Sequence, residues 1–291
     1  VVLGTTACGK SGLGVELARR FDGEIVSADS RQVYKGLDLG TGKVTEEEME
    51  GVPHHMLDVV EPNQPYSVAD FQAGAYAAID DILARGRTPF LVGGTGLYVR
   101  AVTEGFTFTD ARPDPALRAE LEGKTTEELY ALLREKTGVT LTGGEENNRH
   151  RLMRSVEKAL SGRWESPPPC PRYDCLLLGV TFPREEVCRR IDARLQARID
   201  AGMLDEVAEL RANGATDEFL EGLGLEYRYI LRYLTGQIPT LDGLKDELGR
   251  AIKRFAKRQM VWFKKDRDVL WLDMEGDFLT QAVRAVEGFL A

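Results

Sequence analysis

The chain has 291 residues, of which 43% are hydrophobic and 29% are charged, as is ordinary for a globular protein. No apolar stretch approaches the roughly 18 residues that cross a bilayer, no signal-peptide pattern precedes the first strand, and four cysteines are too few for a disulfide scaffold, so we expect a cytoplasmic protein. The net charge of −9 disfavours nucleic-acid binding by bulk attraction, but local basic patches decide such binding.

The beginning of the chain carries a phosphate-loop motif. Residues 4–11 read G-T-T-A-C-G-K-S and match the pattern G-x-x-x-x-G-K-[S/T]. An apolar run precedes the motif and helical apolar spacing follows it, so the loop is expected at a helix N-terminus, where backbone N–H groups can surround an anion. Lys10 would add a positive charge, and the Ser11 hydroxyl could bind Mg²⁺. The alternative is an ordinary strand–turn–helix corner, and the motif does not identify the phosphate compound.

Strands alternate with helices over the first hundred residues, which predicts an α/β fold with a parallel sheet flanked by helices on both faces. The expected strands are Val1–Leu3, Glu24–Ser27, His55–Val59, Thr88–Val92 and, after a long gap, Asp174–Val180. A helix is expected from Ser67 to Arg85, because Ser67 and Asp70 have the spacing of a capping box.

The gap in the strand pattern predicts a small helical insertion domain. Its expected helices are Pro115–Leu121, Thr126–Lys136 and Asn148–Leu160, and a proline-rich segment follows them. We therefore expect an α/β core at 1–111 and 166–291 and an insertion at 112–165. After Val180 the chain is expected to be mostly helical, with helices at Arg184–Ala201, Leu204–Arg211, Glu226–Leu234, Asp242–Lys265 and Phe278–Phe289.

Polar residues follow two further strands of the predicted sheet. Asp29, Ser30, Arg31 and Gln32 come after the second strand, and Gly93–Thr95 after the fourth. Because open parallel sheets bind ligands at the carboxyl ends of their strands, we expect these segments and the phosphate loop to share one crevice. Asp29 would then serve as a base or a metal ligand. A strand-end turn with an Asp cap, or a plain glycine-rich turn, is the competing interpretation.

Basic residues gather in the second half of the chain. Arg190, Arg194 and Arg198 are spaced to share one helical face, and 245–268 holds nine Lys or Arg against four Asp or Glu, with aromatic residues between them. A third cluster comprises Arg149, His150, Arg151 and Arg154. Solvated helix faces would explain each cluster separately, but three of them on an acidic chain favour a polyanionic partner. His54 and His55 are expected to be structural.

These segments together resemble the tRNA dimethylallyltransferases, also called tRNA isopentenyltransferases. The matching segments occur in the family's order: G-T-T-A-C-G-K-S, A-D-S-R-Q-V-Y, G-L-D-L-G-T-G-K, V-P-H-H-M-L-D, Y-S-V-A-D-F, L-V-G-G-T-G-L-Y, R-H-R-L-M-R-S-V-E and A-K-R-Q-M-V-W-F. The resemblance covers essentially the whole chain and implies a P-loop NTPase-like core with a helical insertion. Among the departures, Gly42 stands where the family usually has alanine.

The resemblance implies transfer of a dimethylallyl group from dimethylallyl diphosphate to the exocyclic N6 amine of the adenosine 3′ to the anticodon in tRNA. The phosphate loop would then hold the donor's diphosphate, so no ATP hydrolysis is expected. Mg²⁺ is the implied cofactor, the insertion would bind the anticodon arm, and a monomer is the expected state.

The resemblance also implies site residues. Asp29, Thr95 and Lys10 would be catalytic, and Ser11 would help to hold Mg²⁺. The implied diphosphate-binding residues are Gly4, Thr5, Thr6, Ala7, Cys8, Gly9, Lys10, Ser11, Arg190 and Arg194, with the choice between the two arginines open. The implied tRNA-binding residues are Asp29, Ser30, Arg31, Gln32, Thr95, Arg118, His150, Arg151, Leu152, Met153, Arg154, Lys257 and Arg258.

Three other functions compete with this interpretation. A P-loop small-molecule kinase would explain the first hundred residues but not the later motifs. A prenyltransferase acting on free adenine nucleotides would leave the insertion and the basic clusters unexplained. An RNA-binding module with a relic loop conflicts with the intact Lys10, Ser11 and Asp29.

Overall fold

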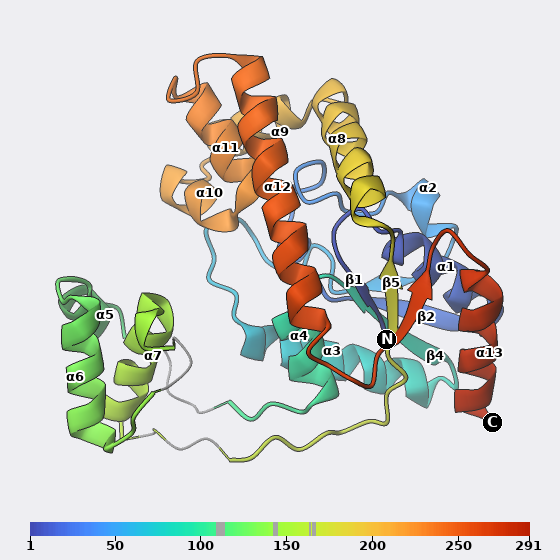
Figure 1. Cartoon of the computed structure of the whole chain (residues 1–291), viewed down its shortest axis with the longest axis horizontal. Coiled ribbons are helices and arrows are strands. Elements are labelled where there is room, and N and C mark those ends of the chain that lie inside the picture. Colours follow the sequence, from blue (N-terminus) through green and yellow to red (C-terminus); the bar gives the residue numbers. More distant parts are fainter. Residues whose placement is uncertain (109–113, 142–144, 163, 165–166) are drawn as a thin grey trace. The chain divides into compact units, whose positions relative to one another are not determined.

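The computed structural model describes residues 1–108, 114–141, 145–162, 164 and 167–291, without the side chains of residues 115 and 145. The chain divides into two compact units, one formed by Val1–Glu104 and Pro171–Ala291 and the other by Gly105–Cys170 (Figure 1). The boundaries expected at 111/112 and 165/166 fall on residues outside those described. No helix in the described part of the chain is long and apolar enough to cross a membrane.

A six-stranded parallel sheet forms the centre of the first unit, in the order β3-β2-β4-β1-β5-β6. Its strands are β1 (Val2–Gly4), β2 (Gly23–Ser27), β3 (His54–His55), β4 (Thr88–Gly93), β5 (Leu178–Thr181) and β6 (Leu270–Asp273). The predicted α/β class with a parallel sheet is confirmed. Strand β6 was not expected, because four residues are too few to show a strand pattern. Its backbone pairing with β5 forms the strand.

Two of the expected strands are shorter in the structure. Strand β3 ends at His55 instead of Val59, because Met56 and Asp58 adopt positive φ values of 66° and 54°, which an extended strand excludes. Strand β5 begins at Leu178 instead of Asp174.

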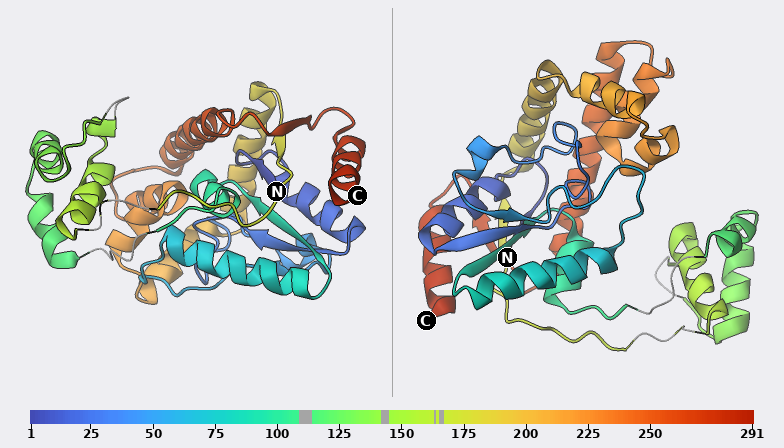
Figure 2. Two further views of the ribbon diagram at one scale, coloured as in Figure 1. Left: turned by 90° about the horizontal axis from the view of Figure 1, so that it is seen from below. Right: turned by 180° about the vertical axis from the view of Figure 1, so that it is seen from behind.

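Helices cover both faces of the sheet (Figures 1 and 2). Apolar residues of α1 (Lys10–Arg20) and α13 (Phe278–Leu290) pack with one set of strand side chains. Those of α3 (Val68–Ala84) and α4 (Gly96–Thr103) pack with the alternate set, which includes Leu3, Val26 and Leu91. Alternate residues of a strand point to opposite faces, so a sheet covered on both sides needs continuously apolar strands. The Ser67–Asp70 capping box at the start of α3 is confirmed.

A group of helices packs beside the carboxyl end of the sheet. It consists of α8 (Arg184–Asp200), α9 (Met203–Ala212), α10 (Asp217–Leu223), α11 (Leu225–Leu234) and α12 (Leu241–Phe263). The group shares a core with Val33 and Leu37, which follow β2. Four of these helices were predicted to within a few residues, and α10, α4 and the short α2 (Glu46–Met49) were not. Helix α12 also contacts α4 and β1, so it reaches from the helical group to the sheet.

The second unit is helical. It contains α5 (Pro115–Glu122), α6 (Thr126–Thr137), a 3₁₀ turn at Glu145–Asn147 and α7 (Arg149–Leu160). Its core comprises Leu121, Leu129, Leu133, Leu152, Met153 and Val156, all nearly inaccessible to solvent. The three helices expected for the insertion are therefore present, each within one or two residues of its expected bounds.

Candidate active site

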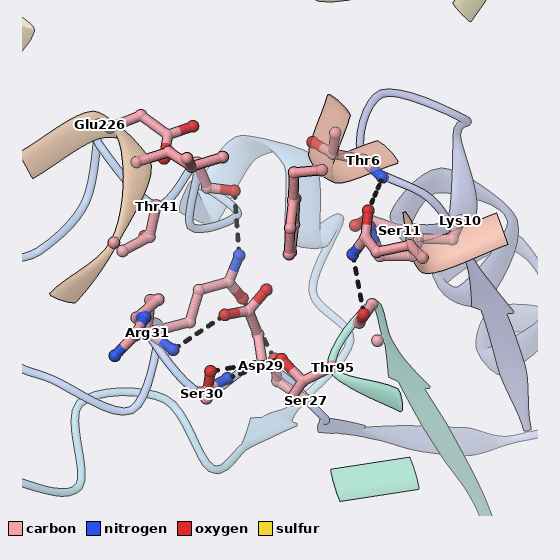
Figure 3. Close-up of a pocket in the computed structure, with 18 of the residues that line it drawn as sticks. Thr6, Lys10, Ser11, Ser27, Asp29, Ser30, Arg31, Thr41, Thr95 and Glu226 are labelled. Carbon is pink, nitrogen blue, oxygen red and sulfur yellow. Dashed lines mark hydrogen bonds between the residues drawn. The ribbon is translucent and has the colours of Figure 1, made fainter. Parts of the chain in front are cut away.

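The three polar strand ends meet at one cavity of about 520 Å³ in the first unit. The phosphate loop and the first turn of α1 contribute Thr6, Lys10 and Ser11 (Figure 3). The segment after β2 contributes residues 29–32, and the connection from β4 into α4 contributes residues 93–97. Helices α8, α11 and α12 complete its wall. The predicted shared crevice is confirmed, and its helical walls come from parts of the chain about 180 to 260 residues after the phosphate loop.

The phosphate loop has the backbone conformation of an anion-binding turn. Helix α1 begins at Lys10, and the preceding Gly9 is left-handed with a φ of 85° and provides no side-chain cap, so the first N–H groups of the helix are not satisfied by a capping side chain. Cys8 is buried and donates from its Sγ to the Thr5 carbonyl at 2.8 Å. A Cβ at Gly4 would lie 2.7 Å from that sulfur, so glycine is required there.

Three cations converge on the cavity from two elements. Lys10 comes from α1, and Arg194 and Arg198 come from successive turns of α8. Burial lowers the pKa of Lys10 and Arg194, and it lowers the pKa of Arg198 to about 10. Nearby acids offset this effect of burial on the arginines only in part. Glu226 lies 3.8 Å from Arg198, but burial raises the pKa of Glu226 and so disfavours its charged form. An entering anion would relieve this excess of positive charge.

Arg190 and Arg194 take different positions, although the sequence left the choice between them open. Arg194 lines the cavity and donates to the Gly42 carbonyl at 3.3 Å. Arg190 is not among the lining residues; its Nε donates to the carbonyl of Ala7 at 2.8 Å, and its guanidinium lies 4.6 Å from the Phe182 ring centre. Arg190 therefore supports the phosphate loop from behind, while Arg194 and Arg198 face the cavity.

The observed positions of these arginines leave no space for a side chain at Gly42. Its φ is +61°, and a Cβ built on it would lie 1.4 Å from the Arg198 Nη2 and 2.3 Å from the Arg194 Nη2. Alanine, the residue usual in the resembling family, would displace both guanidinium groups here. The Gly42 carbonyl also accepts a hydrogen bond from the Gln32 Nε2 at 3.1 Å. This one carbonyl therefore links Gln32, in the segment after β2, to Arg194 on α8.

Asp29 faces the cavity from the segment after β2. Its Oδ1 accepts a hydrogen bond from the backbone N–H of Arg31 at 2.9 Å, which fixes the carboxylate in a local turn (Figure 3). Thr95 accepts from the N–H of Ser30 at 3.1 Å and thereby joins the β4–α4 turn to the same segment. Gln32 is oriented by Ser27, whose hydroxyl donates to the Gln32 Oε1 at 3.1 Å.

Sequence reasoning missed several residues of this wall. Arg198 was placed on the basic helix face but not in the site, and Glu226 and Gln259 were given no role. Their cavity positions depend on how α8, α11 and α12 pack, which no local pattern encodes. For Gln259 the sequence held one indication of a functional role, because this residue lies in the A-K-R-Q-M-V-W-F segment beside Lys257 and Arg258.

The two histidines differ. The His55 Nε2 contacts the buried Glu24 carboxylate at 2.7 Å, in an ion cluster with two partly exposed arginines, so His55 is structural as expected. The His54 ring lines the cavity, but its Nδ1 donates to the Val52 carbonyl at 2.8 Å, and burial lowers its pKa. Among the described residues no group of three or more His, Cys, Asp or Glu side chains could hold a metal ion.

The residues expected to bind tRNA in the helical unit separate into two sets. His150 and Arg151 are exposed on α7. Arg118 and Arg154 contact Glu157, which is 3% exposed, at 2.9 Å and 3.1 Å. Leu152 and Met153 are 0% and 7% exposed in the unit's core. The expectation of RNA contacts from Leu152 and Met153 is corrected, since the amphipathic α7 turns them inward.

Lys257 and Arg258 are exposed on α12, as an RNA contact requires. Arg258 also lines the cavity, and its guanidinium lies 5.8 Å from the Phe255 ring centre. A second hollow of about 410 Å³ adjoins this face of α12 and is lined by Arg254, Lys257, Arg258, Val261, Trp262 and Lys265. Helix α12 thus presents basic and aromatic side chains together at the mouth of the cavity.

Comparison with known proteins identifies the family. The IPP transferase family model matches residues 32–266, and the isopentenyl transferase model matches residues 1–61. The chain belongs to the IPP transferase family.

Relatives in this family match nearly the whole chain. A tRNA dimethylallyltransferase 2 of Shewanella sediminis is 43% identical over 289 residues, which cover 97% of this chain and 95% of the relative. A tRNA isopentenylpyrophosphate transferase structure from Bacillus halodurans is 37% identical, with a TM-score of 0.74, over 99% of this chain and 94% of that one. A eukaryotic dimethylallyltransferase structure, described as acting on tRNA, gives a TM-score of 0.81 at 25% identity over 99% of this chain and 77% of that one.

Proposed function

We propose that this IPP transferase family member is a tRNA dimethylallyltransferase. It transfers the dimethylallyl group from dimethylallyl diphosphate to the exocyclic N6 amine of the adenosine 3′ to the anticodon in tRNA and releases diphosphate. The observation that carries the proposal is one cavity in which Lys10, Arg194 and Arg198 face the carboxylate of Asp29. Excess positive charge suits a departing diphosphate, and the carboxylate suits an amine that must lose a proton.

The cations account for departure of the leaving group. When the allylic C–O bond breaks, its electron pair goes to the diphosphate, which gains negative charge. The N–H groups at the start of α1, which no N-cap side chain satisfies, and the partly buried Lys10, Arg194 and Arg198 stabilise that charge where it develops. The allylic carbon spreads the positive charge left behind, so the weakly nucleophilic N6 amine is sufficient to form the new C–N bond.

Asp29 serves as the base that takes the proton from N6 as the bond forms. Its Oδ1 is held by the Arg31 N–H at 2.9 Å, so the carboxylate is oriented before the substrate enters. Thr95 and Gln32 line the same wall and are themselves fixed by hydrogen bonds to Ser30 and Ser27, which suits contact with the entering adenine.

The cavity also suits Mg²⁺. This ion usually binds through one or two protein oxygens together with substrate phosphates, and the Ser11 hydroxyl lines the cavity. Ser11 would hold it together with the substrate phosphates. When bound, the ion neutralises charge on the diphosphate.

Recognition of the tRNA requires the target base to leave its stack, because its N6 amine is not otherwise accessible to the cavity. Exposed Lys257 and Arg258 on α12, and exposed His150 and Arg151 on α7, would contact phosphates of the anticodon arm, and Ser30 and Arg31 lie beside the entering base. We expect the protein to act as a monomer in the cytoplasm.

Incubation of the purified protein with labelled dimethylallyl diphosphate, Mg²⁺ and bulk tRNA tests the proposal. Mass analysis of the digested nucleosides should show N6-dimethylallyladenosine in tRNA and none from free AMP. Prenylation of AMP alone would identify a nucleotide prenyltransferase. Consumption of ATP with phosphorylation of a metabolite, and no prenylated tRNA, would identify a kinase.

A further inference from the structure

The side chain of Gln259 connects α12 to two loops of the active site. Its Oε1 accepts a hydrogen bond from the backbone N–H of Thr6 at 3.0 Å, in the phosphate loop (Figure 3). Its Nε2 donates to the carbonyl of Gly94 at 2.8 Å, in the β4–α4 turn. Thr6 and Gly94 both line the cavity. One amide thus joins three elements that are far apart in the sequence.

The two partners fix the orientation of this amide. Both are backbone groups with unchangeable roles, one a donor and one an acceptor. A side chain turned by 180° would place its NH₂ against an N–H and its oxygen against a carbonyl, so both hydrogen bonds would be lost. Gln259 therefore holds the separation between Thr6 and Gly94 through a single rotamer.

Gly94 is small enough to allow this contact. A Cβ at position 94 would lie 2.9 Å from the Gln259 Nε2 and 3.4 Å from the Cε of Lys10. The glycine thus allows the Gln259 amide and the Lys10 side chain to approach the same turn.

The phosphate loop is held at two adjacent residues by side chains from two other helices, one in the cavity wall and one outside it. Gln259 of α12 binds the N–H of Thr6, and Arg190 of α8 binds the carbonyl of Ala7. Ala7 has a positive φ of 62°, a conformation that is costly for alanine and needs support from outside the loop. The two contacts hold that conformation.

We propose that Gln259 is a positioning residue for the prenyl donor. It fixes the Thr5–Thr6 peptide, through the Thr6 N–H, so that the remaining loop N–H groups and Lys10 converge on the diphosphate. This inference rests on the proposed function, because it assigns the loop to the donor's diphosphate. It predicts that Gln259 controls donor affinity and leaves affinity for tRNA largely unchanged.

Replacement of Gln259 by methionine tests the proposal, because methionine has a similar length and lacks both polar atoms. Calorimetric titration with Mg²⁺ pyrophosphate should give a Kd about tenfold higher, which corresponds to about 1.4 kcal/mol. In steady-state assays the KM for dimethylallyl diphosphate should rise by a similar factor, while the KM for tRNA stays within about twofold. Gln281→Met, at an exposed position on α13, is the matched control and should bind pyrophosphate as the native protein does.

Gly94→Ala provides a second, independent variant. Its added Cβ should push the Gln259 amide away and weaken pyrophosphate binding to a similar degree. The effects of Gly94→Ala and Gln259→Met should not add in the double variant, because both remove the same contact. Circular dichroism and thermal melting establish that each variant is folded, and Gly94→Ala alone decides the question if Gln259→Met does not fold.

Pyrophosphate binding by Gln259→Met equal to that of the native protein would overturn the inference. Tighter binding would also overturn it, since Gln259 would then compete with the donor for the Thr6 N–H. A rise in the KM for tRNA alone would assign Gln259 to RNA contact instead. Because pyrophosphate binding does not require prenyl transfer, this comparison decides the inference even if the proposed reaction is not observed.

Discussion

Strand β2 has a charged cluster near each end, and the two clusters are neutralised very differently. At its amino end, the Glu24 carboxylate is 2% exposed and contacts Arg85, Arg87 and His55. Beyond its carboxyl end, Asp29 shares the cavity with Lys10, Arg194 and Arg198, whose pKa values burial lowers. Hydrogen bonds, chiefly from Arg85, instead hold the pKa of Glu24 far below its usual value.

The difference separates a structural cluster from a binding site. At the Glu24 end, each charge has protein partners, so the cluster stabilises the native fold. At the cavity end, three cations share few acidic partners, so holding their charges there lowers the stability of the folded protein. Substitutions should therefore affect stability at one end of β2 and substrate binding or turnover at the other.

The largest effect is expected from Asp29→Ala. Loss of the base should reduce prenyl transfer by about a thousandfold, while pyrophosphate binding changes little. Single-turnover assays with labelled donor, together with calorimetric titration, measure both quantities. Near-native turnover would remove Asp29 from the mechanism. Asp242→Ala, which removes an exposed carboxylate in the first turn of α12, is the matched control and should retain native activity.

Lys10→Met should weaken donor binding by about a hundredfold, because a charge-assisted contact to the diphosphate is lost. Its melting temperature should not fall, because the native protein holds this ammonium where burial disfavours its charge. In the native protein, donor binding should weaken as the pH rises through the lowered pKa of Lys10. A large loss of stability in the variant would place Lys10 with the structural charges.

Glu24→Gln should lower the free energy of unfolding by about 2–3 kcal/mol, in contrast to Lys10→Met. The loss is smaller than for a fully buried ion cluster, because the Arg85 and Arg87 side chains are 40% and 36% exposed. Prenyl transfer by the folded fraction should remain native-like. Because the folded pKa of Glu24 is depressed, its stabilisation is complete above the ordinary Glu pKa of 4.5 and is lost as the pH falls below that value. Denaturant titrations at pH 7 and pH 4 should show a smaller pH effect in the variant.

The smallest effect is expected on the RNA side, where the cations are exposed. Lys257→Ala with Arg258→Ala should weaken tRNA binding by roughly tenfold and lower the slope of log Kd against log salt by about two. Arg19→Ala with Arg20→Ala, exposed in the last turn of α1 and outside the three basic clusters, provides a charge-matched control. An unchanged slope in the first variant would place the RNA contacts elsewhere.

The helical unit shows why charge in a sequence is an uncertain guide to RNA contact. The R-H-R-L-M-R segment contains exposed residues, His150 and Arg151, beside core residues, Leu152 and Met153. Arg154 contacts the buried Glu157, as does Arg118 from α5. Helical periodicity could have separated the inward from the outward positions. The pairing of both arginines with one carboxylate depends on how α5 and α7 pack.

The sequence by itself determined the phosphate loop, the alternation of strands and helices, and the helical insertion, because each depends on local spacing and on backbone groups that only certain residues accommodate. It also placed Asp29 and Thr95 at one sheet edge, since parallel strands end together. Only the tertiary structure decided that Arg194 and Arg198 enter the cavity, that Arg190 and Gln259 hold the phosphate loop, and that β6 joins the sheet. These contacts join segments more than 90 residues apart, and their geometry arises from helix packing that no short pattern records.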